Sequence, residues 1–316
     1  MIYIHKDIIY TQPLYKFIKS ILDKKKIPNQ IIDAHDLNFI VNSLDVKDDD
    51  VLIARFAHDE KDLIQTQRVF PTLTKKFKTM FPSEESYYYF DDKLKQYEFM
   101  VENDIPCLET HYVGNKEEIE KLNMNFPIVT KKTWGAGAEQ VNYFETLDSV
   151  VDDETTRSWT QDSIYPCLVQ EYEDVNYDLR IVIMGKKVFS HKRMHKWKTR
   201  NKDDFPYGMP KNSREKVLKY RYPPHRLPEQ EMCDDSELLD LVDLTTKLQE
   251  IQETKLNTKH MSWDIVNGKV LEFGYISTLG LTGRHYDLDK NKICDFKYYN
   301  NYFTKHLEYL LMEYIK

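Results

Sequence analysis

The stretch FPIVTKKTWGAGAEQV, residues 126–141, joins an apolar run to lysines and a loop of small residues. The run predicts a strand near residues 128–132, and the small residues 135–137 predict a loop that leads back into a second strand. Backbone amides in such a loop can approach phosphate oxygens closely, and a strand lysine such as Lys131 can supply a fixed positive charge. By itself, a glycine-containing hairpin with solvated lysines also explains the stretch.

A second pair of strands is predicted at residues 167–172 and 179–184, joined through an acidic linker. The carboxylates of Glu171 and Asp178, at the strand ends, can accept hydrogen bonds from an adenine amino group and from ribose hydroxyls. The guanidinium of Arg180 would face anions. An ordinary charged hairpin accounts for the same residues, because a surface Asp-x-Arg pair usually has no further meaning.

The dipeptide Asn267-Gly268 is the strongest hairpin signal in the chain. Asp264 and Glu272 lie on the two arms of that hairpin, where carboxylates on adjacent strands can converge on one hard cation. Mg²⁺ needs few protein oxygens, since phosphates and water complete its octahedron. A solvated hairpin with two exposed acids is the alternative interpretation.

The N-terminal part of the chain begins with a predicted strand followed by a predicted helix. The apolar patches at 2–4, 31–32 and 51–56 predict buried strands of a small parallel sheet. They indicate a Rossmann-like lobe up to about Tyr89, and the lack of a G-x-G-x-x-G turn argues against a bound dinucleotide. Near Asp91 the pattern changes to a helix, which this residue is expected to cap.

The composition excludes several classes of protein. The chain has 316 residues, 41% of them hydrophobic, and can bury a sizeable core, so we expect neither disorder nor low complexity. A formal charge of -7 gives no field that attracts nucleic acid or an anionic membrane. The cysteines form no C-x-x-C pair, and no apolar run is long enough to span a bilayer. The first residues lack a signal-peptide pattern, so we expect a cytoplasmic protein.

Taken in chain order, the segments resemble the ATP-grasp superfamily, and most closely its RimK-like amino-acid and peptide ligases. The resemblance runs from about Lys93 to Ser277. It implies an α/β (α+β) ATP-grasp fold with a Rossmann-like pre-grasp domain at 1–90, an N-lobe at 91–175 and a C-lobe at 176–316 that carries the metal and catalytic residues. The residues that carry the resemblance are Lys93, Lys131, Gly135, Ala136, Gly137, Gln170, Glu171, Tyr172, Asp178, Arg180, Arg193, Asp264 and Glu272.

The resemblance implies a nucleotide site formed by residues from both lobes. Lys93, Lys131 and the loop of small residues would bind the phosphates of ATP. The Gln-Glu-Tyr segment at 170–172 would hold the adenine edge, and Asp178 would take a ribose hydroxyl. Asp264 and Glu272 would hold Mg²⁺, with Mn²⁺ as an alternative ion. The metal would offset charge on the transferring phosphoryl group.

The resemblance also implies the reaction and its partners. Asp264 and Glu272 would be the metal ligands. A substrate carboxylate would attack the γ-phosphate and an amine would take the resulting acyl phosphate, with Arg193 or Arg180 stabilising the oxyanion and the leaving phosphate. The expected partners are small-molecule or peptide carboxylates and amines, with no nucleic acid and no membrane. Self-association into a homo-oligomer stays open.

One departure from the family pattern bears on the metal site. The family usually reads Glu-x-Asn, whereas this chain has Glu272-Phe273-Gly274, and glycine has no side-chain ligand. Because of Gly274, an ATP-binding regulator that does not turn over is one alternative. A second is an ATP-grasp kinase, which phosphorylates an oxygen without a ligation step. A plain α/β interaction protein would require every motif match to be accidental.

Overall fold

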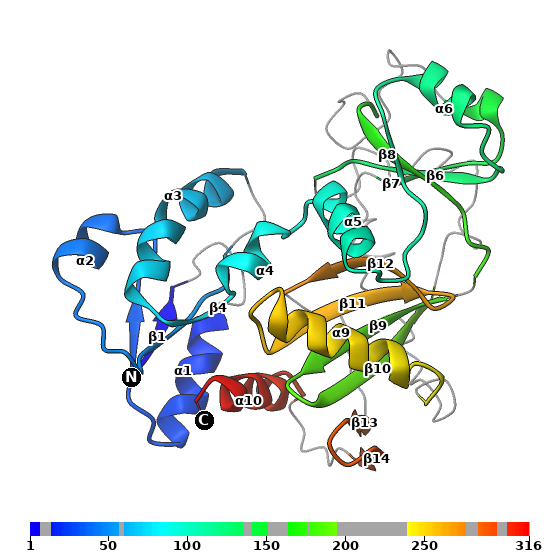
Figure 1. The fold of residues 1–316 in the computed structure, drawn as a ribbon. Coiled ribbons are helices and arrows are strands. Elements are labelled where there is room, and N and C mark those ends of the chain that lie inside the picture. The colour runs from blue at the N-terminus through cyan, green and yellow to red at the C-terminus, as the bar shows by residue number, and fades with distance from the viewer. Residues whose placement is uncertain are drawn as a thin grey trace.

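Three β-sheets form the framework of the part of the protein that the structure describes. The computed structural model describes residues 1–6, 14–56, 60–134, 141–150, 164–175, 177–194, 239–275, 284–295 and 302–315. Figure 1 shows a four-stranded N-terminal sheet on the left, a six-stranded sheet in the centre and a second four-stranded sheet at the upper right. None of the described helices combines the length and the apolar character needed to cross a membrane.

The N-terminal sheet is parallel throughout, as the apolar runs predicted. Its elements are β1 (Ile2–His5), α1 (Leu14–Lys24), β2 (Asn29–Ile32), α2 (Leu37–Asn42), β3 (Val51–Ile53), α3 (Glu60–Lys76), β4 (Thr79–Phe81) and α4 (Glu84–Tyr88). The strand order is β2-β1-β3-β4, so the direction of winding reverses between β1 and β3. Every residue of β1 and β3 is buried, which is typical of strands covered by helices on both faces.

The second four-stranded sheet is called the lysine sheet below, because its strand β6 carries Lys131. Its elements are β5 (His111–Val113), α6 (Lys116–Leu122), β6 (Ile128–Lys131), β7 (Val141–Phe144), η1 (Leu147–Ser149) and β8 (Cys167–Glu171). The strands are antiparallel in the order β5-β8-β6-β7. Ile128 and Thr130 are buried and Ile128 packs with Ile119 of α6. Side chains alternate along a strand, so Lys131 lies on the face away from this core.

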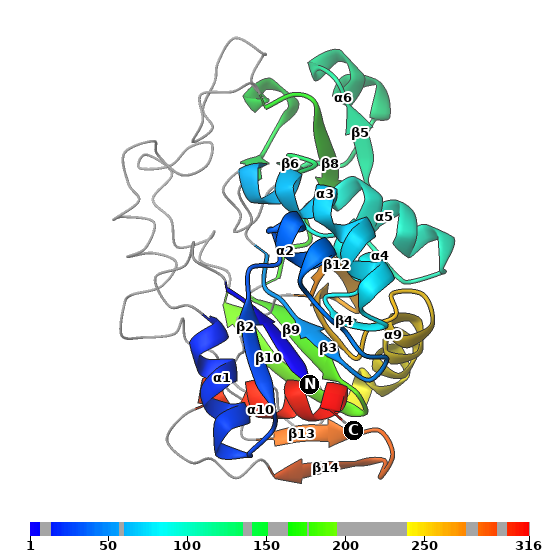
Figure 2. The same cartoon turned by 90° about the vertical axis from the view of Figure 1, so that its left-hand side faces the viewer.

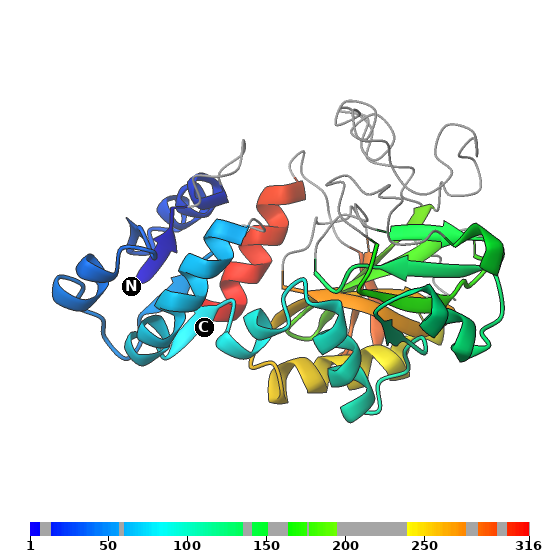
Figure 3. The same cartoon turned by 90° about the horizontal axis from the view of Figure 1, so that it is seen from above.

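The six-stranded sheet is antiparallel, with the order β12-β11-β9-β10-β13-β14. Its elements are β9 (Tyr177–Met184), β10 (Lys187–Met194), α9 (Val242–Thr254), β11 (His260–Val266), β12 (Lys269–Gly274), β13 (Arg284–Asp287) and β14 (Lys292–Asp295). One face buries Ile181 and Trp263, and the indole Nε1 of Trp263 donates to Gln252 of α9 at 3.5 Å. Figure 3 shows α9, in yellow, against the sheet, and α10 (Tyr302–Ile315), in red, between this sheet and the N-terminal one.

The predicted hairpin at Asn267-Gly268 is confirmed. It joins β11 to β12, and both residues have a left-handed backbone, with φ of 48° at Asn267 and 74° at Gly268. Two successive positive φ values are the signature of the tight turn that suits the twist of antiparallel strands. The turn therefore sets the pairing of the two strands that carry Asp264 and Glu272.

The cap of helix α5 (Lys93–Glu102) lies one residue later than expected. The prediction that Asp91 caps it is wrong, because Asp91 has a φ of 53°, a left-handed backbone. A cap residue needs an extended backbone, which Asp92 has, and the Asp92 carboxylate accepts from the amide of Lys95 at 3.2 Å. The amide of Lys93 donates to the carbonyl of Thr133 at 2.7 Å, so the start of α5 is fixed to the end of β6.

Gln96 of α5 holds the edge of the six-stranded sheet. Its Nε2 donates to the carbonyl of Phe273 at 2.9 Å, and its Oε1 accepts from the amide of Phe273 at 3.1 Å. The same Nε2 donates to the carbonyl of Tyr89 at 2.8 Å. Gln96 is 2% exposed, and it satisfies two backbone groups of β12, the edge strand. One helix therefore contacts both the lysine sheet and the six-stranded sheet.

Replacing Gln96 by alanine should lower the free energy of unfolding by about 2–4 kcal/mol, because the buried amide and carbonyl of Phe273 each lose a partner. The measurement is urea denaturation followed by circular dichroism. Glu98→Ala is the matched control, since Glu98 is exposed on the same helix and a surface change should stay within about 0.5 kcal/mol. Equal midpoints for the two variants would show that Gln96 does not hold β12.

Candidate functional site

A row of charged residues crosses three neighbouring strands of the six-stranded sheet. Asp264 on β11 pairs in register with Glu272 on β12 and with Arg180 on β9. Residues directly opposite in an antiparallel pair have their side chains on the same face, about 5 Å apart at Cβ. Asp178 is two residues before Arg180 and shares this face. Two segments that are distant in the sequence thus meet on one sheet face.

A β-bulge puts Glu272 on this face. Ile265 pairs with Val270, yet Asp264 pairs with Glu272, so Leu271 is the extra residue. With regular pairing, Leu271 would lie opposite Asp264 and Glu272 would turn toward the buried apolar face. Bulges that re-aim a side chain are common beside functional sites.

Arg180 and Asp264 form a buried bidentate ion pair. Nε of Arg180 donates to Oδ1 of Asp264 and its Nη2 donates to Oδ2, both at 2.8 Å. The two side chains are 14% and 3% exposed. Because the planar guanidinium matches both carboxylate oxygens, it fixes the orientation of the Asp264 carboxylate. Apolar replacements of such a pair often keep or raise stability, so stability alone does not explain the pair.

Lys131 lies within the electric field of this row. Burial lowers the pKa of its ammonium group, and the nearby charge of Lys93 lowers it further. The carboxylates of Glu272, Asp264 and Asp178 act in the opposite direction. Lys131 belongs to the lysine sheet and the three carboxylates to the six-stranded sheet, so groups from both sheets form one cluster. A buried lysine with a lowered pKa beside several carboxylates is typical of functional sites.

The beginning of α5 brings Lys93 to the same cluster. Besides the bond from the Lys93 amide to Thr133, Asp92 forms an isolated antiparallel bridge with Trp134. The first turn of a helix carries a partial positive charge, which adds to the charge of the two lysines. The lysine-rich side of the site thus combines a helix N-terminus with the end of β6, and it faces the acidic row.

The three residues predicted at the adenine edge take different positions at the end of β8. Gln170 is buried, and its Nε2 donates to Oγ1 of Thr110 at 2.7 Å. Glu171 is exposed and accepts from the amide and the side chain of Asn125, at 2.9 and 3.0 Å. Tyr172 packs edge-on against Tyr143, with ring centroids 5.1 Å apart. Their contact with adenine stays a prediction.

Some predicted site residues lie outside what the structure describes. Gly135, Ala136 and Gly137 fall in the segment 135–140, which is not among the described residues. The backbone of Arg193 is described and pairs with Asp178 in the β9–β10 ladder, but its side chain is not. The phosphate loop and the role of Arg193 therefore stay predictions.

Sequence reasoning missed Ser262, which lies two residues before Asp264 on the same strand and face. Ser262 pairs with Gly274 across the β11–β12 ladder, and its hydroxyl donates to the carbonyl of Gly274 at 2.9 Å. The alternation of polar and apolar residues along β11 is the signal that could have identified it. Ser262 places a hydroxyl beside the position at which the ATP-grasp pattern has asparagine.

By sequence, no family model and no curated protein matches the chain. Comparison of structures finds similar proteins over nearly the whole chain. A RimK domain protein ATP-grasp from Sphaerobacter thermophilus DSM 20745 has a TM-score of 0.54 and 11% identity, covering 99% of this chain and 97% of that one.

Two further similar structures are ligases that were solved with nucleotides. The ATP-grasp ligase PsnB, complexed with minimal precursor, Mg and ADP, has a TM-score of 0.59 and 11% identity, covering 100% of this chain and 98% of that one. The D-alanine–D-alanine ligase from Bacillus anthracis, complexed with ATP, has a TM-score of 0.56 and 15% identity, covering 92% and 90%. The α/β fold expected from the motifs is confirmed, and the chain has the ATP-grasp fold.

Proposed function

We propose that the chain is an ATP- and Mg²⁺-dependent carboxylate–amine ligase, which forms an amide through an acyl phosphate. The observation that carries the proposal is that Asp264 and Glu272, paired on the six-stranded sheet, lie near enough to Lys131 of the lysine sheet to act on its pKa. A magnesium nucleotide needs cations for its phosphates and hard oxygen ligands for its metal. The fold shared with structures of ATP-grasp ligases agrees with this assignment.

Asp264 and Glu272 suit Mg²⁺ in the kind and number of their donors. Mg²⁺ is held by one or two protein carboxylates together with phosphates and water. Asp264 can ligate while it accepts from Arg180, because each carboxylate oxygen has a second lone pair. Gly274 adds no side-chain ligand, so we assign one metal ion to the pair, and Mn²⁺ suits the same oxygens. When bound, the ion would offset charge on the phosphates.

The remaining site residues would hold the nucleotide. Lys131 and Lys93 would contact its phosphates, together with backbone amides of the small residues 135–137. Asp178 would accept from a ribose hydroxyl, and the segment 170–172 would lie along the adenine edge. Support comes from the shared face of Asp178 and Arg180 and from the link between α5 and β6.

The proposed reaction needs no nucleophile from the protein. An oxygen of the substrate carboxylate attacks the γ-phosphorus, the bond to the β-phosphate oxygen breaks, and ADP leaves with that electron pair. The nitrogen of an amine then attacks the acyl carbon, the carbon–oxygen bond to phosphate breaks, and the amine loses a proton. Since Arg180 binds Asp264, we assign it to orienting that carboxylate and assign Arg193 to the developing oxyanion.

The proposed substrate class is supported by the names of similar structures. One PsnB structure holds a precursor peptide, and the Bacillus anthracis protein is named as a D-alanine–D-alanine ligase. We therefore propose small-molecule or peptide carboxylates and amines as substrates. A kinase with the same fold is a second candidate, and Gly274 supports a third, a regulator that binds ATP without turnover.

The lowered pKa of Lys131 predicts a specific dependence of stability on pH. The folded protein binds the Lys131 proton less tightly than the unfolded chain does, so stability rises with pH between the depressed pKa and the ordinary value of 10.5. Lys131→Met should remove that contribution. Urea denaturation from about pH 7 to pH 10 should show the wild type gaining free energy relative to the variant. The control is Lys121→Met, at an exposed position on α6, whose free energy of unfolding should change with pH as that of the wild type does. The same pH dependence in Lys131→Met and the wild type would contradict the assignment of the lowered pKa to Lys131.

Purified protein should release ADP only when ATP, Mg²⁺, a suitable carboxylate and a suitable amine are all present. The experiment is an ADP-release assay over a panel of carboxylates and amines, with amide product identified by mass. Lys131→Ala and Glu272→Ala should each lower turnover by about 100-fold or more, because each removes charge that stabilises the phosphoryl transfer.

Two exposed residues serve as matched controls in that assay: Lys121→Ala on α6 and Glu250→Ala on α9 should keep full turnover. ADP release without any amine would favour the kinase. Binding of MgATP with no ADP release over the whole panel would favour the regulator. Turnover that neither Lys131→Ala nor Glu272→Ala changes would remove the site assignment.

A further inference from the structure

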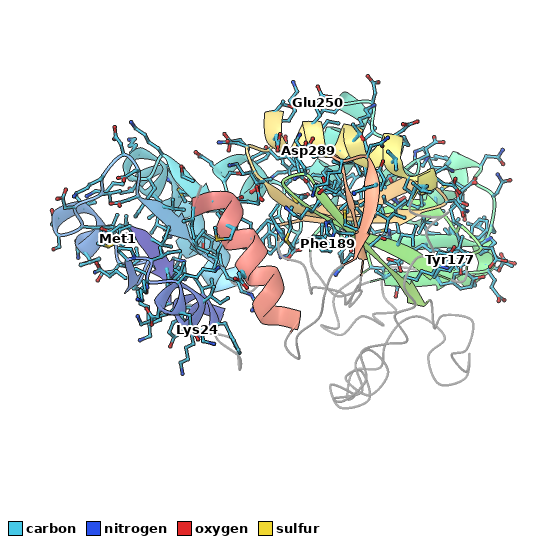
Figure 4. The ribbon with its side chains drawn as sticks, turned by 90° about the horizontal axis from the view of Figure 1, so that it is seen from below. Met1, Lys24, Tyr177, Phe189, Glu250 and Asp289 are labelled. Atoms are coloured by element: carbon cyan, nitrogen blue, oxygen red, sulfur yellow. The ribbon has the colours of Figure 1, made fainter. Side chains whose placement is uncertain are left out.

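The hairpin β13–β14 forms the edge of the six-stranded sheet opposite to β12. It joins the sheet through the pairs Lys187–Asp287 and Val188–Tyr286. Figure 2 shows the hairpin below α10, away from the lysine sheet, and Figure 4 marks Asp289 in its turn. Nothing in the proposed ligase mechanism uses this hairpin.

Three side chains with metal-binding atoms gather on one face of the hairpin. His285 and Cys294 are directly opposite each other in the ladder, and Asp287 follows His285 by two residues, so all three share a face. Their nitrogen, oxygen and sulfur atoms lie within 4.8 Å of one another. His285 is 6% exposed and Asp287 is 5% exposed, while Cys294 is half-buried. Among the described residues, no other group of three or more such side chains is this close.

The donor set distinguishes this cluster from the acidic row. Imidazole nitrogen, thiolate sulfur and carboxylate oxygen together suit Zn²⁺ and its neighbours, whereas Mg²⁺ prefers oxygen alone. Zn²⁺ bonds of about 2.0–2.3 Å in a tetrahedron put ligand atoms about 3.3–3.8 Å apart. The ligand atoms, up to 4.8 Å apart, would therefore come about 1 Å closer together around a bound ion.

Lys290, Phe189 and Lys187 border the cluster. Oδ2 of Asp287 accepts from the ammonium of Lys290 at 2.7 Å, and Oδ1 accepts from the Lys290 amide at 3.1 Å. The Lys290 side chain is 61% exposed, so a cation that takes its place releases it into water at small cost. Phe189 packs against the His285 ring, with centroids 5.3 Å apart. Lys187 pairs with Asp287 across the β10–β13 ladder, and its Nζ lies 3.9 Å from Oε1 of Glu313 in α10.

We propose that His285, Asp287 and Cys294 form a binding site for a zinc-like divalent transition metal, separate from the magnesium nucleotide site. Three protein ligands leave one tetrahedral position for water. The metal would join the two strands of the hairpin and stabilise the folded form of this edge. The proposal is independent of the ligase reaction, because it concerns the opposite edge of the sheet.

The test titrates the purified 316-residue chain with Co²⁺ in an excess of Mg²⁺ and follows the near-ultraviolet absorbance of a cobalt–thiolate bond. One equivalent of Co²⁺ should produce this band, and Zn²⁺ should abolish it by displacement. Cys294→Ser should lose the band, whereas Cys107→Ser, which removes another half-buried thiol, should keep it. Asp287→Ala should weaken binding by about tenfold or more, and Lys290→Ala should strengthen it.

No thiolate band in the wild type, or an equal band in Cys294→Ser, would overturn the proposal. Circular dichroism of each variant, compared with the wild type, establishes that a lost band reflects a lost ligand and not loss of folding. Absorbance and circular dichroism do not depend on turnover, so failure of the ligase proposal would leave this result unchanged.

Discussion

The buried ion pair between Arg180 and Asp264 is the interaction on which the candidate site depends. Taking both charges out of water costs several kcal/mol, and removing one partner of such a pair typically costs about 3–5 kcal/mol. The pair is nonetheless placed in the middle of the sheet, with both carboxylate oxygens held at 2.8 Å. Apolar side chains often stabilise a protein as well as such a pair does. An oriented carboxylate is useful only to a ligand that binds it, which in our account is a metal ion.

Two structural features bring the rest of the site to this carboxylate. The bulge at Leu271 turns Glu272 onto the face of Asp264. Helix α5 contacts the lysine sheet through the Lys93 amide and contacts β12 through Gln96. Because one helix is hydrogen-bonded to β12 and to the segment that follows β6, these bonds help to set the distance between the lysines and the acids. A nucleotide between two such sheets would meet charges that are already in place.

Part of this arrangement could be predicted from the sequence. The strand with Lys131 and the Asn267-Gly268 hairpin depend on local patterns, and both are present as predicted. Three features could not be predicted. The helix cap lies at Asp92 because the backbone of Asp91 turns left-handed. Gln96 binds a strand 177 residues away, and Gln170 turns inward to Thr110. Each depends on tertiary contacts that no local pattern carries.

The central claim is that the two sheets together bind one magnesium nucleotide. Isothermal titration calorimetry of the purified chain with ADP, in the presence and absence of Mg²⁺, tests this claim most directly. The account predicts one ADP per chain and an affinity at least about tenfold higher with Mg²⁺, since the metal links the phosphates to the carboxylates. No measurable binding of ADP or ATP with Mg²⁺ present would contradict the account.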